Sequence, residues 1–161
     1  MDSINKVKSI SIWIFVIPFV AVNACLILIT TFHDLFPNKE HVLVGFIFPY
    51  FDGGASISRT ARVFPTYLIF KPAMFLTAYL LIKYWIYNKK IVSSIYGEHK
   101  HIKKFLFFGI ASAICLVLHS IFLGIKYDYD LYKLFRRVVM LMFIIFEIVA
   151  QAYLVATLYS F

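Results

Sequence analysis

The sequence predicts an all-α polytopic membrane protein, in which residues 1–161 form one four-helix transmembrane bundle with an ordered first loop. Composition is the first observation: the chain is 62% hydrophobic and 15% charged, whereas about a quarter of a soluble domain is charged. The second observation is the mean hydropathy of +0.84, which agrees with this composition. The third observation is that the apolar residues fall into four runs, each near the roughly 20 residues that cross a bilayer core.

The first two spans are predicted at residues 10–32 and 63–87. Residues 10–32 contain Pro18 and Asn23, which membrane helices tolerate when neighbouring groups satisfy the freed polar atoms. This run is long and has no small-x-small cleavage site, so we interpret it as a retained helix rather than a signal peptide. The second span ends in Tyr84, Trp85 and Tyr87, a set typical of the membrane interface.

The third and fourth spans are predicted at residues 105–125 and 138–159. Residues 88–104, which connect the second span to the third, carry five lysines. The polar first loop covers residues 33–62, and within it residues 41–51 are apolar but too short to span. We expect this short run to pack on the helices or to lie at the membrane interface.

The formal net charge of +8 comes from basic residues that flank the apolar runs. This placement favours interaction with anionic lipid head groups, not nucleic acid. Counting Lys and Arg near the span ends gives eight on each side, so the positive-inside rule does not decide the orientation. The concentration of lysine in residues 88–104 favours cytoplasmic termini and a lumenal or extracellular first loop, in a membrane that the sequence leaves open.

Polar residues inside the predicted spans suggest an intramembrane polar layer. With a rise of about 1.5 Å per residue, Asn23, Lys71, His119 and Glu147 fall at similar depths below the first loop. An ionisable group at this depth is costly if it faces lipid, so we expect Glu147 to pair with Lys71. His119 or Asn23 would be further partners, and Gln151, one turn from Glu147, would extend the network.

Two interpretations of this layer stay open. The ion pair alone would hold helices together, and His119 would be a hydrogen-bonded packing residue. Alternatively, the layer is a pocket that receives a lipid head group, with Lys71 near its mouth and Arg59 and Arg62 above it to bind phosphate. The loop gate of this second interpretation also contains Asp52, Ser56 and Ser58.

The loop residues themselves favour structural roles over catalysis. Asp52 precedes two glycines, which is typical of a turn. The serine hydroxyls are more typical of groups that cap or brace a loop, because no histidine is near in sequence to activate a nucleophile. His119 and Glu147 are the acid–base candidates if the chain is an enzyme, which we do not expect.

The sequence indicates no cofactor and no metal site. Cys25 and Cys115 each lie inside an apolar run and are interpreted as small buried residues, not as a disulfide or a metal pair. No CxxC, HExxH, GxSxG, Walker or dinucleotide-binding pattern occurs.

Several of these residues resemble a known family. The order FPYFDGGASIS, then Pro65, then PTYLIFK entering the second span is similar to the Frag/DRAM/Sfk superfamily of multi-pass membrane proteins. That superfamily includes proteins that remodel the lipid of glycosylphosphatidyl anchors, and its last helix carries a glutamate where Glu147 lies. Its members have six spans, so this chain would be a version shortened to four. The resemblance implies a protein that handles lipid head groups or lipid distribution.

Two classes of function follow. In the first, the bundle binds an anionic or glycosylphosphatidyl-type lipid over the Lys71–Glu147 layer. In the second, the chain is a non-catalytic accessory subunit that packs against a larger membrane protein complex and covers its edge.

Overall fold

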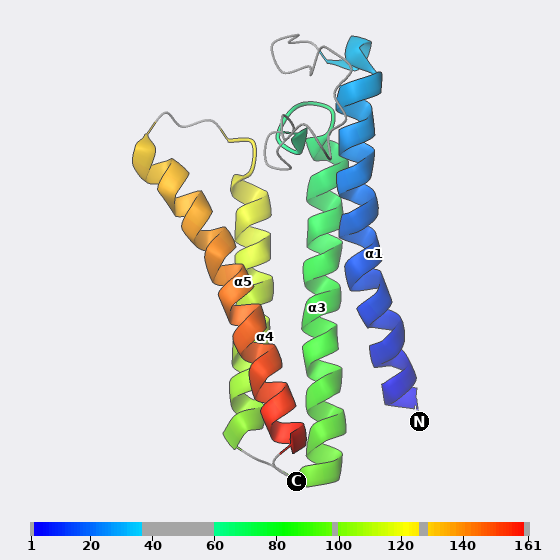
Figure 1. Ribbon diagram of the computed structural model, residues 1–161, viewed down its shortest axis with the longest axis vertical. Coiled ribbons are helices and arrows are strands. Elements are labelled where there is room, and N and C mark those ends of the chain that lie inside the picture. Colours follow the sequence, from blue (N-terminus) through cyan, green and yellow to red (C-terminus); the bar gives the residue numbers. More distant parts are fainter. Residues whose placement is uncertain (1, 37–59, 98–99, 126–128, 160–161) are drawn as a thin grey trace.

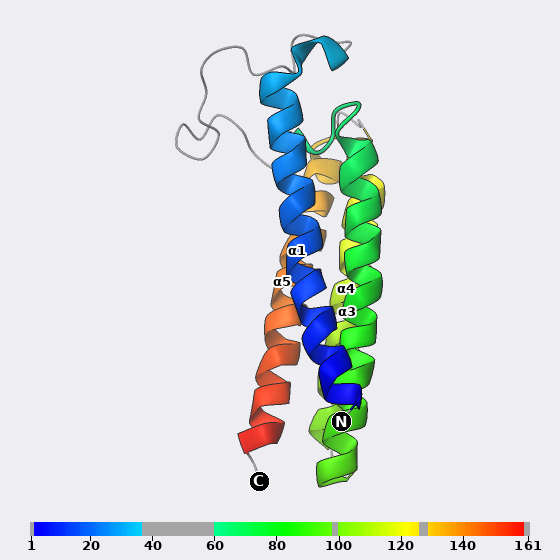
Figure 2. The same cartoon turned by 90° about the vertical axis from the view of Figure 1, so that its right-hand side faces the viewer.

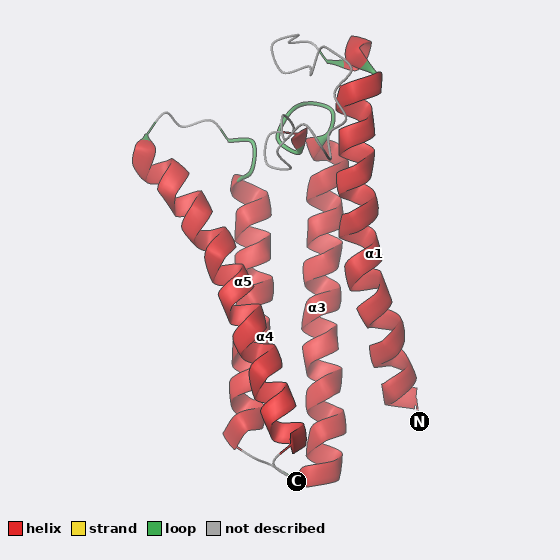
Figure 3. Cartoon of the chain, viewed as in Figure 1, coloured by secondary structure: helices red, strands yellow, loops and turns green. Residues whose placement is uncertain are grey.

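A computed structural model of the chain describes residues 2–36, 60–97, 100–125 and 129–159. These residues form helices and connecting loops without a strand (Figure 3). The elements are α1 (Asp2–Thr31), the short 3-10 helix η1 (His33–Leu35), α3 (Tyr67–Tyr96), α4 (Lys100–Phe122) and α5 (Asp130–Tyr159). The four α-helices are long and apolar enough to cross a membrane. The predicted all-α four-helix bundle is therefore confirmed, and the chain is a multi-pass membrane protein.

The helices pack mainly against their neighbours in sequence: α1 against α3, α3 against α4, and α4 against α5. Figure 1 shows α1 and α5 at opposite edges of the bundle, and Figure 2 shows the same helices turned by 90°. We call the end where α1 begins and α5 ends the terminal face. The opposite end, where α1 and α4 end and α3 and α5 begin, is the loop face. The first α5 turns lean away from the bundle at the loop face (Figure 1).

The centre of the bundle is a close approach of α3 and α4. Trp85 and Phe105 are both fully buried, with ring centroids 5.9 Å apart. The Trp85 ring lies against Gly109, where an added Cβ would come within 2.4 Å of indole carbon atoms. Small residues at helix interfaces are typical of membrane proteins, in which close backbone approach replaces the hydrophobic effect as the source of association.

One residue of the predicted interfacial set, Trp85, packs inside the bundle. Its side chain is fully buried. The position of an aromatic residue near the end of an apolar run does not reveal the side of the helix on which it lies. In this chain the indole faces α4.

The helix ends also differ from the predicted span ends. α3 continues to Tyr96 and α5 begins at Asp130, so most of residues 88–104 are helical. Hydropathy locates the part of a helix inside the bilayer core, whereas hydrogen bonding continues the helix through the head-group region. At the start of α5 an ion pair joins Lys133 to Asp130 at 3.0 Å, and the acidic residue lies at the positive end of the helix dipole.

The contact between α1 and α3 includes one of the two cysteines. The Cys25 thiol is buried and donates to the Thr66 carbonyl at 3.5 Å. Cys115 is half-buried, and both thiols are free, in agreement with the prediction that they form no disulfide. Residues 41–51, for which we expect interfacial packing, lie outside the described residues.

Candidate functional site

The polar residues predicted to share one layer occupy two levels of the bundle. The first set is Arg62, Lys71, His119 and Arg136, which we call the basic group. It lies around the end of α4 at the loop face. The second set is Ser112, Glu147 and Gln151, which we call the carboxyl group. It joins the middle parts of α4 and α5.

Lys71 reaches the last turn of α4. Its Nζ donates to the Ile121 carbonyl at 3.4 Å and lies 5.6 Å from the centroid of the Tyr67 ring. The last carbonyls of a helix lack intrahelical donors and form the negative end of its dipole. Lys71 therefore links the start of α3 to the end of α4. Its two partners, the Ile121 carbonyl and the Tyr67 ring, carry no net charge.

Arg62 lies at the same end of α4. Gly124, just after the helix, has a φ of 93°, a conformation that favours glycine because it has no Cβ. A Cβ at Gly124 would lie 3.4 Å from the backbone oxygen of Arg62 and 4.0 Å from its Cβ. The backbone of Arg62 is thus packed on the end of α4, while its side chain is exposed.

Arg136 approaches this turn from α5. Its Cζ lies 5.9 Å from the centroid of the Tyr132 ring, and the hydroxyl of Tyr132 donates to the Phe122 carbonyl at the end of α4 at 2.7 Å. The His119 Nδ1 atom is buried and has no hydrogen-bond partner among the described residues. Lys71 of α3 and Arg136 of α5 therefore lie near the end of α4, on which the backbone of Arg62 also packs.

The carboxyl group is built from one residue of α4 and two of α5. Ser112 is fully buried, and its Oγ lies 2.8 Å from Glu147 Oε2. The same Oγ lies 2.8 Å from the Gly109 carbonyl oxygen. Gln151 donates its Nε2 hydrogen to Glu147 Oε1 at 3.2 Å, so the expected contact between Gln151 and Glu147 is formed.

The predicted pairing of Lys71 with Glu147 is wrong. Lys71 contacts α4 at Ile121 and Glu147 contacts it at Ser112. These two α4 positions are nine residues apart, or about 13 Å along the helix axis. The error came from the helix starts: α5 begins eight residues before the predicted residue 138 and α3 begins four residues after the predicted residue 63. Lys71 is consequently shallower, and Glu147 deeper, than expected.

Asn23 forms a hydrogen bond within its own helix. Its Nδ2 donates to the Phe19 carbonyl at 2.7 Å, one turn earlier on α1. This helix packs chiefly against α3. The remaining gate residues, Asp52, Ser56, Ser58 and Arg59, lie outside the described residues, so their role stays a prediction.

Sequence reasoning missed Ser112 and Arg136. Ser112 belongs to the buried set of α4, which follows a spacing of three or four residues except for the adjacent pair Ser112 and Ala113. The members are Ile102, Phe105, Gly109, Ser112, Ala113, Leu116 and Ser120. The small residues among them are a usable signal for a helix interface. Arg136 was assigned to a link, and only the early start of α5 turns it toward α4.

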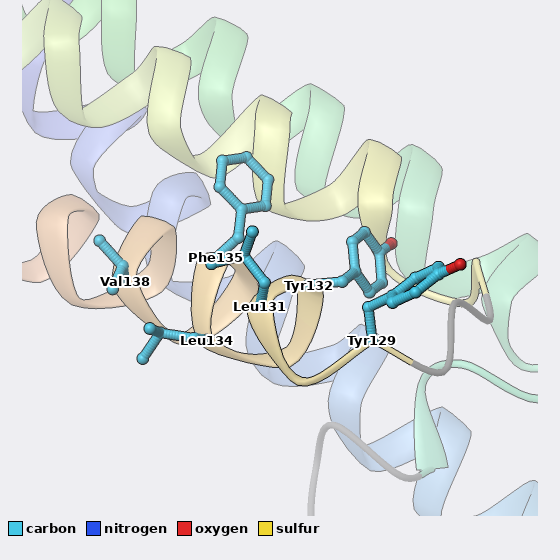
Figure 4. Close-up of a pocket in the computed structure, with 6 residues that line it drawn as sticks. All are labelled: Tyr129, Leu131, Tyr132, Leu134, Phe135 and Val138. Atoms are coloured by element: carbon cyan, nitrogen blue, oxygen red, sulfur yellow. The ribbon is translucent and has the colours of Figure 1, made fainter.

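An apolar groove of about 720 Å³ lies beside the basic group, at the start of α5. Figure 4 shows its lining residues, which are Tyr129, Leu131, Tyr132, Leu134, Phe135 and Val138. The Tyr132 hydroxyl donates to the Phe122 carbonyl at 2.7 Å, and the Phe122 and Phe135 rings pack edge-on at 5.4 Å. These contacts attach the floor of the groove to the end of α4.

Comparisons with protein-family models, curated proteins and solved structures find no match for this chain. The fold therefore defines its class: a four-helix, multi-pass membrane protein, with the basic group at the loop face. Within the described residues, no group of three or more His, Cys, Asp or Glu side chains is placed to hold a metal ion.

Proposed function

We propose that the protein binds the head group of an anionic membrane lipid, with the lipid phosphate at the basic group on the loop face. The observation that carries the proposal is that Lys71 of α3 and Arg136 of α5 both lie near the last turn of α4, on which the backbone of Arg62 packs. Like charges gathered at one place repel one another unless an anion compensates them. Phosphate oxygens form short charge-assisted hydrogen bonds with both lysine and arginine.

Membrane geometry supports a lipid as the source of the phosphate. The basic group lies at one end of helices that cross the bilayer, which is the level of the head groups. The apolar groove lies on the first turns of α5, which also carry Arg136, so the acyl chains of the same lipid have an apolar surface to contact. A lipid-handling role also agrees with what the resemblance to the Frag/DRAM/Sfk superfamily implies.

The proposal places the site away from Glu147. The basic group and the carboxyl group are about 10 Å or more apart along α4, since His119 is seven residues beyond Ser112. This separation also leaves His119 and Glu147 without a shared substrate position, so an acid–base enzyme is the less favoured function. For orientation we retain cytoplasmic termini and a lumenal or extracellular loop face.

Two lysines of α3 provide a matched test. Lys71 and Lys83 each lie over the tyrosine four residues earlier, at 5.6 Å from Tyr67 and 4.6 Å from Tyr79, but only Lys71 belongs to the basic group. Lys71→Ala, Lys83→Ala and wild type should be reconstituted in nanodiscs and titrated with a fluorescent phosphatidic acid, with phosphatidylcholine as the neutral comparison.

Lys71→Ala should weaken binding of the anionic lipid by about 10-fold or more, because a hydrogen bond to a charged group contributes about 1.5–3 kcal/mol. Lys83→Ala should bind like wild type. Equal losses in both variants would show that general positive charge attracts the lipid, and the proposed site would be wrong. Equal affinity for the neutral lipid would also contradict it.

The second candidate is an accessory subunit of a larger membrane complex. The observation in its favour is that α5 presents a wide row of exposed apolar side chains, including Leu141, Ile145, Ile148 and Val155. A partner helix would cover this row. If wild-type protein purified alone from native membranes in mild detergent has the mass of a single chain plus detergent, the subunit function is contradicted.

A further inference from the structure

The contacts around Glu147 contain too few hydrogen atoms when Glu147 is ionised, because one hydroxyl hydrogen then faces two acceptor oxygens. The Ser112 hydroxyl has one hydrogen, yet its Oγ lies 2.8 Å from two oxygen atoms, Glu147 Oε2 and the Gly109 carbonyl oxygen. A carboxylate and a carbonyl are both acceptors only. With an ionised Glu147, the one hydroxyl hydrogen either serves one of these oxygens or is shared between both, which weakens each bond.

A proton on Glu147 satisfies all three contacts at once. The acid O–H at Oε2 then donates to Ser112 Oγ, and Ser112 donates its own hydrogen to the Gly109 carbonyl. Gln151 donates to Oε1, which is the carbonyl oxygen of the neutral acid, at 3.2 Å. Donors and acceptors alternate along the whole chain, and buried polar groups in folded proteins are paired in this way.

The charges around Glu147 agree with a neutral carboxyl. On α4, Ser112 is neutral, and the cationic Lys104 lies 5.1 Å from the Tyr153 ring centroid. The titratable residues nearest to Ser112 along the same helix are Cys115 and His119. On α3, Lys71 is at Ile121 and Lys83 is over Tyr79.

On α5 itself the neighbour one turn along is the neutral Gln151. Glu147 is half-buried near the middle of a 30-residue helix that spans the membrane. A carboxylate without a cation is costly at this depth.

We propose that Glu147 is a proton-binding site inside the membrane. The Glu147 side chain is held as the neutral acid by Ser112, which accepts its hydrogen, and by Gln151, which donates to its carbonyl oxygen. The site is independent of the lipid phosphate site at the loop face. Its ligand is a proton, and its two protein partners are uncharged.

Infrared spectroscopy tests the proposal directly, since the C=O stretch of a protonated carboxylic acid is separate from the bands of a carboxylate. Full-length protein in lipid vesicles at neutral pH should show this acid band, and Glu147→Gln should remove it. Gln151→Leu should keep the band but move it to higher frequency, because the hydrogen bond to the C=O is lost. A structural role alone predicts no such shift.

Glu147→Gln also serves as a folding control. A glutamine amide imitates the neutral acid, with its oxygen facing Gln151 and its NH2 group donating to Ser112, so the variant should unfold at the wild-type denaturant concentration. If Glu147→Gln removes a carboxylate band from the spectrum and not an acid band, Glu147 is ionised in the wild-type protein and the proposal is wrong.

A chemical probe gives a second measurement. Dicyclohexylcarbodiimide enters the bilayer and reacts with a protonated carboxyl, whose proton moves to a carbodiimide nitrogen while the carboxyl oxygen bonds to the central carbon. Mass spectrometry should find the adduct on Glu147, and adding a water-soluble carbodiimide instead should label it at least about tenfold less. Absence of the adduct from the folded wild-type protein would contradict the proposal.

Discussion

Gly109→Ala tests whether the α3–α4 contact depends on the absence of a side chain. A Cβ at position 109 would lie 2.4, 2.4 and 2.5 Å from three carbon atoms of the Trp85 ring. Ordinary contacts between carbon atoms are about 3.5–4.0 Å. Either the two helices separate by about 1 Å or the indole leaves its site, and the fully buried Phe105 blocks a simple rotation.

The expected magnitude combines two opposing effects. Overpacking of a filled core costs about 1–3 kcal/mol, whereas replacing a helical glycine by alanine gains about 1 kcal/mol of helix propensity. Because the indole is rigid and enclosed, we expect the steric cost to exceed the gain. With a steric cost of about 2–3 kcal/mol, the upper part of that range, Gly109→Ala should therefore destabilise the protein by about 1–2 kcal/mol net.

A double-mutant cycle with Trp85→Ala isolates this contact. Without the indole, Gly109→Ala meets no ring and should be neutral or stabilising by up to about 1 kcal/mol. Reversible unfolding in mixed micelles, followed by circular dichroism, gives the four stabilities. Fluorescence of Trp85 in a Trp13→Phe background should shift to the red when alanine is present at position 109.

The reasoning is refuted if Gly109→Ala is as stable as wild type while Trp85 remains in place. It is also refuted if the alanine has the same effect with and without Trp85, since neighbouring residues that clash must show a coupling energy.

Two further variants test polar contacts between α4 and α5. Ser112→Ala removes a partner of Glu147 and should destabilise the protein by about 1–3 kcal/mol. Ser120 is equally buried, but in the described contacts it bonds only within its own helix, at 2.8 Å. Ser120→Ala should therefore cost less in the same unfolding assay. Tyr132→Phe removes the 2.7 Å bond to the Phe122 carbonyl and should cost about 0.5–1.5 kcal/mol. Tyr129→Phe, at a side chain that is 75% exposed, should match wild type, and an equal loss there would contradict the Tyr132 assignment.

The number and class of the helices could be predicted from the sequence because the bilayer imposes a local requirement. A membrane helix must present about 20 consecutive apolar residues, and that run is visible without any knowledge of its neighbours. The contact between Gln151 and Glu147 was predictable for the same reason, since residues four apart on a helix are neighbours. Helix ends were less predictable, because hydropathy stops at the edge of the core while α3 and α5 continue beyond it.

Tertiary structure alone decided which polar residues meet across helices. In a soluble helix an apolar stripe marks the inner face, but in a membrane both the lipid and the protein interior are apolar. The sequences of α3 and α4 therefore do not show that Ser112 faces α5 or that Trp85 faces Gly109. Relative depth also depends on where each helix begins and on how it packs. The predicted starts of α3 and α5 were wrong by four and eight residues, and this error placed Lys71 beside Glu147. Packing instead places Lys71 at Ile121 and Glu147 at Ser112.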